Sequence, residues 1–112
     1  MTDTTNIKST LVDVKTLNEA LVAKEDCVVL DVRTPEEFER GKILGGINLP
    51  VDKVKGNIEN IIPNKHKKIF IYCQSGERSA IAAEELISLG YDNVFDVENG
   101  ILAWKESNFP TF

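Results

Sequence analysis

The chain is predicted to form an α/β domain in which helices cover both faces of a mainly parallel β-sheet. Short apolar segments alternate along the sequence with segments whose apolar residues recur at helical spacing, and this order is typical of βαβ units. Ile69–Tyr72 is apolar or aromatic at every position, as strands are when both faces of a sheet are covered. We therefore expect three layers, with the sheet in the middle.

The two kinds of segment predict five strands and five helices. Residues 1–9 are polar and are predicted to form a flexible tail, so that residues 10–112 make up a single domain. Gly56 is expected to interrupt the third helix, because glycine disfavours helix interiors. The expected strands are residues 10–12, 27–32, 47–50, 69–72 and 93–97, and the expected helices are residues 13–24, 35–40, 51–62, 80–89 and 100–107.

Capping residues mark where two of these helices begin. Either Asp13 or Thr16 can cap the first helix, and Thr16 also has the spacing of a capping box. At the second helix, Thr34 and Glu37 have the same spacing, and Pro35 occupies the first helical position, where proline fits best. A helix should therefore start directly after the second strand.

Composition and charge argue against several classes of protein. With 112 residues, 42% of them hydrophobic and 28% charged, the chain has the composition of one globular domain. No apolar run approaches the roughly 20 residues of a membrane span, the first residues lack the pattern of a signal peptide, and a net charge of −5 disfavours nucleic-acid binding. Cys27 and Cys73 lie at opposite ends of their predicted strands, so we expect free thiols and a cytoplasmic protein.

Cys73 is the strongest candidate for a reactive residue. It follows the predicted central strand and precedes a helix, at the edge of the sheet where α/β proteins bind ligands. Loop N–H groups and a helix N-terminus favour a thiolate, which is the nucleophilic form. Gly76 permits a sharp turn, and Arg78 places a fixed cation nearby. On residue type alone, a buried structural cysteine is an equally good interpretation.

Arg33 stands at the end of the second strand, level with this loop in a parallel sheet. Two roles are open: an ion pair with a neighbouring carboxylate, or help in binding an anionic substrate. Asp31 is interpreted as a structural partner for loop backbone or for an arginine rather than as a catalytic base.

Three motifs occur in order along the chain. The loop has the form Cys73-x-x-Gly76-x-Arg78-Ser79. The preceding motif is Val29–Phe38 followed by Gly41 and Gly45–Pro50, and the last motif is Asn93–Val97 with Gly100, Trp104 and Pro110. Together they resemble the rhodanese family of sulfurtransferases over about residues 10 to 110. The sequence departs from the family at Gly41–Gly46, where the usual Gly-His-Ile-Pro-Gly-Ala reads Gly-Lys-Ile-Leu-Gly-Gly, and at Asn99, where glycine is common.

The resemblance implies a rhodanese-like fold with a central five-stranded sheet and sulfur transfer through a persulfide on Cys73. The donor would be thiosulfate, a polysulfide or a persulfide, and the acceptor cyanide or a thiol. No cofactor or metal is implied, and His66 is the only histidine that could assist a cysteine or a metal. The residues expected to bind substrate are Arg33, Gln74, Ser75, Gly76, Glu77, Arg78 and Ser79.

Three other functions share parts of this sequence pattern. Cysteine phosphatases and arsenate reductases of related fold have a loop one residue longer than the six residues Cys73–Arg78, which makes room for a tetrahedral oxyanion. A persulfide carrier that relays sulfur between partner proteins would need the same loop as an enzyme. Non-catalytic domains of the family typically lack the cysteine. Because Gln74 is neutral and Glu77 offsets Arg78, we expect doubly charged thiosulfate to be a poor donor.

Overall fold

The computed structural model describes residues 8–112 of the protein, so most of the tail predicted for residues 1–9 lies outside the described part. The elements are β1 Thr10–Val12, α1 Val14–Val22, β2 Val28–Asp31, α2 Pro35–Glu39, β3 Gly46–Asn48, α3 Val51–Ile61, β4 Ile69–Tyr72, α4 Glu77–Ser88, β5 Val94–Val97 and α5 Gly100–Glu106. The five strands form one sheet in the order β1-β5-β4-β2-β3, and every neighbouring pair is parallel. The predicted five-stranded α/β fold is confirmed.

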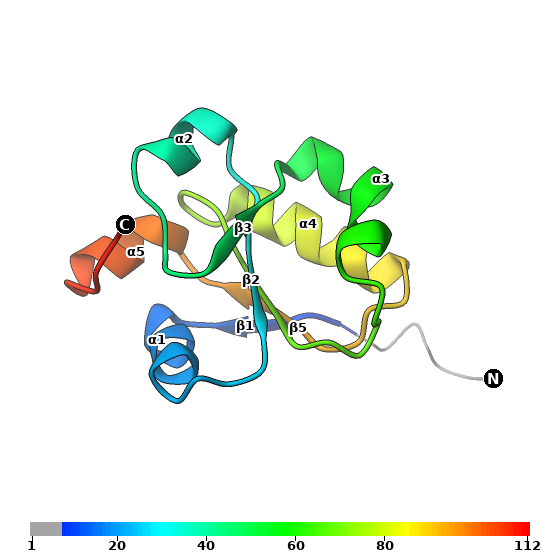
Figure 1. The fold of residues 1–112 in the computed structure, drawn as a ribbon, viewed down its shortest axis with the longest axis horizontal. Coiled ribbons are helices and arrows are strands. Elements are labelled where there is room, and N and C mark those ends of the chain that lie inside the picture. Colours follow the sequence, from blue (N-terminus) through cyan, green and yellow to red (C-terminus); the bar gives the residue numbers. More distant parts are fainter. Residues whose placement is uncertain (1–7) are drawn as a thin grey trace.

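The sheet is covered on both faces, as Figure 1 shows. On one face α3 and α4 pack over Ile69 and Ile71 of the central strand, and on the other face α1 and α5 pack over Phe70 and Tyr72. All four of these residues are fully buried, which explains why β4 is apolar throughout. The carboxyl ends of β2 and β4 lie side by side, because Asp31 pairs with Tyr72 in the sheet.

The predicted helix starts are largely observed. The Thr34 hydroxyl accepts a hydrogen bond from Glu37 N at 3.2 Å, and the Glu37 carboxylate accepts one from Thr34 N at 2.9 Å, which completes the capping box. Of the two candidate caps for α1, Asp13 is the cap, since its carboxylate accepts from Thr16 N at 2.9 Å. Asn99 adopts a left-handed conformation with φ of 61°, so the turn before α5 forms despite the missing glycine.

Two helix predictions were wrong in detail. The predicted interruption at Gly56 does not occur, because Val54 and Ile58 on either side are buried against the core and outweigh the helix cost of one exposed glycine. The helix after the loop begins at Glu77 rather than at Ala80, because its first turn carries polar residues that the apolar periodicity does not mark. Within residues 8–112, no helix is long and apolar enough to cross a membrane.

Candidate active site

The sulfur of Cys73 lies beneath the loop that joins β4 to α4. Cys73 directly follows β4 and is only 1% exposed. Its Sγ accepts a hydrogen bond from Gly76 N at 3.1 Å, and Ser79 Oγ lies 3.6 Å from it. Gly76 has φ of 121°, a conformation that favours glycine, and this turn aims its N–H at the sulfur. The N-terminus of α4 therefore stabilises negative charge on Sγ or on an atom bound to it.

The side chains of the loop divide into two groups. The Ser79 hydroxyl is fully buried beside the sulfur and donates to Gly76 O at 3.1 Å, which fixes the turn. Ser75 and Glu77 instead face outward, where the Ser75 hydroxyl donates to the Glu77 carboxylate at 2.5 Å and lowers its pKa. Gln74 is half-buried between the loop and Arg33. Only Gly76 and Ser79 of the predicted loop residues contact the sulfur by hydrogen bonding.

The N-terminus of α5 supports the loop from below. Ile101 N donates to Cys73 O at 2.9 Å, and Leu102 N donates to Gln74 O at 3.2 Å. Gly100 has φ of 54°, and a Cβ at this position would lie 2.2 Å from Cys73 O. Only glycine can occupy this position without displacing the loop. The sequence places Gly100 in the last family motif, yet nothing in that motif indicates contact with Cys73.

Arg78 is paired with a residue that the sequence analysis assigned only to helix capping. Its guanidinium donates to both carboxylate oxygens of Glu37, at 2.7 Å and 3.0 Å. This hydrogen bonding lowers the pKa of Glu37 from 4.5 to about 2. The charge of Arg78 is therefore largely neutralised, and the loop is tied to α2. The sequence contains one indication of this pairing: Glu37 follows the second strand closely and therefore lies at the same edge of the sheet as the loop.

Replacing Glu37 with glutamine is expected to lower the free energy of unfolding at pH 7 by about 1 kcal/mol, because the pair is partly exposed and glutamine keeps the capping box. The pKa of Glu37 is lower in the folded protein than in the unfolded chain. Its contribution is therefore complete above about pH 4.5 and is lost as the pH falls towards 2. Urea unfolding of Glu37→Gln and of the control Glu36→Gln between pH 7 and pH 3 measures this. Equal pH dependence of the two variants would contradict the assignment.

Arg33 forms the ion pair that was one of its two proposed roles. It is 3% exposed, its Nη2 lies 2.7 Å from Asp31 Oδ2, and the same nitrogen donates to Gly41 O at 2.7 Å. The pair also explains Asp31, which accepts from the backbone N–H of Arg33 at 2.9 Å, as expected of a structural partner. The other terminal nitrogen of the guanidinium, Nη1, lies 3.5 Å from the Gln74 amide oxygen. Arg33 thus contacts the loop through Gln74, while its positive charge is balanced by Asp31.

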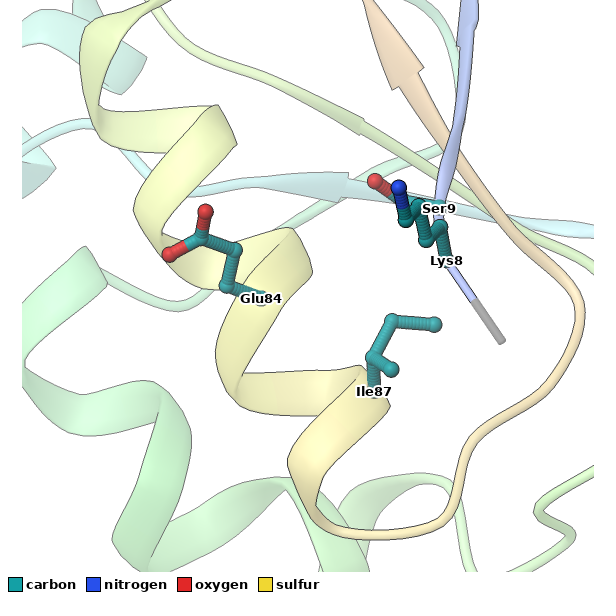
Figure 2. Close-up of a pocket in the computed structure, with 4 residues that line it drawn as sticks. All are labelled: Lys8, Ser9, Glu84 and Ile87. Carbon is teal, nitrogen blue, oxygen red and sulfur yellow. The ribbon is translucent and has the colours of Figure 1, made fainter. Parts of the chain in front are cut away.

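Among residues 8–112, cavities lie in at least three parts of the fold, and one of about 300 Å³ lies beside Trp104 and the end of α1. The other two differ in how close they come to Cys73. One of about 130 Å³ adjoins the loop and is lined by Arg33, Glu37, Arg40, Gln74 and Lys105. The sequence analysis did not predict Arg40 or Lys105, which α2 and α5 bring together. The other, of about 400 Å³, lies between α4 and the chain entering β1, and Figure 2 shows its lining residues Lys8, Ser9, Glu84 and Ile87. It lies at the amino-terminal edge of the parallel sheet, away from Cys73. Within residues 8–112, no group of three acidic, cysteine or histidine side chains could hold a metal.

The protein is therefore a parallel α/β protein in which a cysteine follows the central strand and lies under a loop that leads into a helix. Residues 10–107 match the family model described as a rhodanese-like domain. The chain therefore belongs to the rhodanese family, as its motifs suggested.

Relatives of the chain include named sulfurtransferases. A sulfurtransferase of Allochromatium vinosum is 33% identical over 99 residues, covering 88% of this chain and 91% of the relative. Thiosulfate sulfurtransferase 16 of Arabidopsis thaliana is 36% identical over 73% of this chain and 77% of its own length. The crystal structure of a rhodanese-related protein from Thermoplasma volcanium matches with a TM-score of 0.81 at 35% identity, covering 92% of this chain and 97% of that chain. Several other relatives are longer, and the chain spans between 24% and 64% of their length.

Proposed function

We propose that the protein is an enzyme that transfers sulfane sulfur from a donor to cyanide or a thiol through a persulfide on Cys73. The observation that carries this proposal is the position of Sγ, which is enclosed by the loop and accepts the Gly76 N–H at 3.1 Å. A persulfide ends in a negatively charged sulfur that needs hydrogen-bond donors and exclusion of water. Sulfurtransferases among the relatives support the same reaction class.

The reaction needs two displacements. In the first, the Cys73 thiolate attacks the outer sulfur of the donor, the donor's sulfur–sulfur bond breaks, and its electron pair leaves with sulfite or with a thiolate. In the second, cyanide or an acceptor thiolate attacks the outer sulfur of the persulfide, and Cys73 leaves as a thiolate. Each step forms one bond and breaks one, so the cycle needs no external oxidant or reductant and no cofactor.

Incubation with polysulfide or thiosulfate, followed by intact-mass measurement, tests this function. We expect the protein to gain the mass of one sulfur atom and to lose it again when cyanide is added. A protein that never gains sulfur from any of these donors, with Cys73 also inert to alkylation, would leave Cys73 with a purely structural role.

Charge at the loop argues that thiosulfate is a poor donor. Arg78 is neutralised by Glu37 and Arg33 by Asp31, which leaves the sulfur without an unpaired cation from these residues. Replacing Gln74, which follows Cys73, with arginine should lower the KM for thiosulfate about tenfold, because one added charge close to a dianion contributes on the order of 1 kcal/mol. Steady-state assays with thiosulfate and cyanide measure this, and Gln74→Met provides a neutral control. A wild-type KM already as low as that of the arginine variant would contradict the charge argument.

A persulfide relay is the second candidate function. The relatives include an adenylyltransferase and sulfurtransferase of Meyerozyma guilliermondii, of which this chain matches only 24%, so in that protein the matching part accompanies a longer chain. Faster loading of Cys73 by a partner protein's persulfide than by any small donor would favour the relay. We also propose that the protein acts in the cytoplasm, where its cysteines, both free in the structure, would stay reduced.

A further inference from the structure

The cavity of about 130 Å³ beside the loop contains a surplus of positive charge. Three of its five lining residues are cations, Arg33, Arg40 and Lys105, and one is an anion, Glu37. Arg33 is already paired with Asp31, and Glu37 is already paired with Arg78. Arg40 and Lys105 make no ion pair or side-chain hydrogen bond with any other residue of 8–112. Two unbalanced cations therefore face one small cavity in a chain whose net charge is −5.

The size of the cavity restricts what it can hold. Its volume is a few times the roughly 30 Å³ that one water molecule occupies in the liquid, and it is well below the roughly 300 Å³ of pockets that enclose a whole ligand. The space therefore suits one small anionic group rather than a complete organic molecule. The remainder of the ligand would lie outside the cavity.

The position of the cavity next to the Cys73 loop indicates what kind of ligand would fit it. Gln74, the residue after Cys73, lines the cavity, and Glu37 joins it to the loop through Arg78; Cys73 itself is not a lining residue. A group in the cavity would therefore lie against Gln74, the neighbour of Cys73 in the chain, and not against Cys73 itself. In thiosulfate the anionic oxygens are only two bonds from the transferred sulfur, which gives it a short reach from Cys73 into a cavity that Cys73 does not line. A thiol whose carboxylate is several bonds from its sulfur can reach Cys73 and fill the cavity together.

We propose that Arg40 and Lys105 form a subsite for the carboxylate of a small organic thiol, which brings sulfur to Cys73 as a persulfide or removes it as the acceptor. This proposal rests on the sulfur-transfer function and specifies its substrate class. Arg40 and Lys105 contact the substrate's carboxylate and take no part in the bond changes at sulfur. Their removal should raise KM for acidic thiols and leave kcat nearly unchanged.

Matched thiols test the subsite. The protein is first loaded with sulfur from polysulfide, and the loss of that sulfur to 6-mercaptohexanoate or to 6-mercaptohexanol is followed by intact mass. The double variant Arg40→Gln/Lys105→Gln should lower kcat/KM for the acid about tenfold, as expected for the loss of two partly exposed charge contacts, with the alcohol nearly unaffected. The control, Lys24→Gln/Lys55→Gln, removes the same charge from exposed positions elsewhere and should keep the preference for the acid.

A second readout does not depend on sulfur transfer. In a Cys27→Ser background, the 2-pyridyl disulfides of the same two thiols react with Cys73 and release pyridine-2-thione, whose absorbance gives the rate. The acid derivative should react faster with the wild-type site, and only the Arg40/Lys105 variant should lose this preference. If Cys73 never loads with sulfur but the preference is present, the proposed function fails while the subsite stands. Equal changes for acid and alcohol, or no change for either, would overturn the subsite.

Discussion

Cys73→Ser is expected to abolish sulfur loading completely, while the fold is retained. Serine is close in size to cysteine, and Ser79 Oγ and Gly76 N can still hydrogen-bond to the new hydroxyl. A serine hydroxyl at neutral pH cannot attack a sulfane sulfur as a thiolate does, so the variant should show no persulfide and at least about a thousandfold lower turnover. Intact mass after polysulfide treatment and cyanide-dependent thiocyanate release measure the two effects.

Cys27→Ser is the matched control for this variant. Cys27 precedes β2, whereas Cys73 follows β4, so the two thiols lie at opposite edges of the parallel sheet. The Cys27 variant should load one sulfur as the wild type does. Loading that persists in Cys73→Ser and disappears in Cys27→Ser would transfer the reactive role to Cys27 and refute the proposed site.

Gly100→Ala is expected to cause the largest effect of any change outside the loop itself. A Cβ at this position would lie 2.2 Å from Cys73 O, 2.7 Å from Gln74 O and 2.8 Å from Cys73 C, and all three are backbone atoms that cannot rotate away. Overpacking of this kind costs about 1–3 kcal/mol, and the left-handed φ of 54° adds strain for alanine. We expect the free energy of unfolding to fall by about 3 kcal/mol and sulfur loading to slow by at least about a hundredfold.

Gly56→Ala provides the control on the other side of the sheet. Gly56 lies on the exposed face of α3, and a Cβ there meets no atom within 4 Å. Alanine in a helix interior is about 1 kcal/mol more favourable than glycine, so this variant should be more stable and fully active. Urea unfolding should show a lower free energy of unfolding for Gly100→Ala and a higher one for Gly56→Ala. The rate of sulfur loading should fall only in Gly100→Ala. Gly100→Ala with wild-type stability and loading would show that the loop does not depend on close contact with α5.

Local patterns in the sequence were sufficient for most of the fold. The five strands and five helices follow from apolar periodicity, and the Thr34 capping box was predictable because its partners are three residues apart. The place of Cys73 at the carboxyl end of the central strand follows from the order of strand, loop and helix. These features depend on residues close together in the chain, where spacing alone determines which groups meet.

Gly56 shows where local propensity failed. Glycine weakens an isolated helix, yet α3 continues through it, because Val54 and Ile58 are fixed in the core by β-strands and α4. Packing contacts of this kind come from other parts of the chain. A propensity argument that considers only the helix does not contain them.

The tertiary structure alone decided how the site is built. Glu37 and Arg78 are 41 residues apart in sequence, and they meet because β2 and β4 lie side by side and end at the same edge. The close approach of Gly100 to Cys73 and the cavity shared by Arg40 and Lys105 likewise join segments that only the folded chain brings together. The sequence by itself therefore determined the fold, the family and the position of the cysteine that we propose to be reactive. Asp31, which pairs with Arg33, is only two residues away and was expected as a structural partner. The pairing of Arg78 with Glu37, the support of the loop by α5 and the cavity that Arg40 and Lys105 share are long-range contacts, which depend on three-dimensional packing rather than on spacing along the chain.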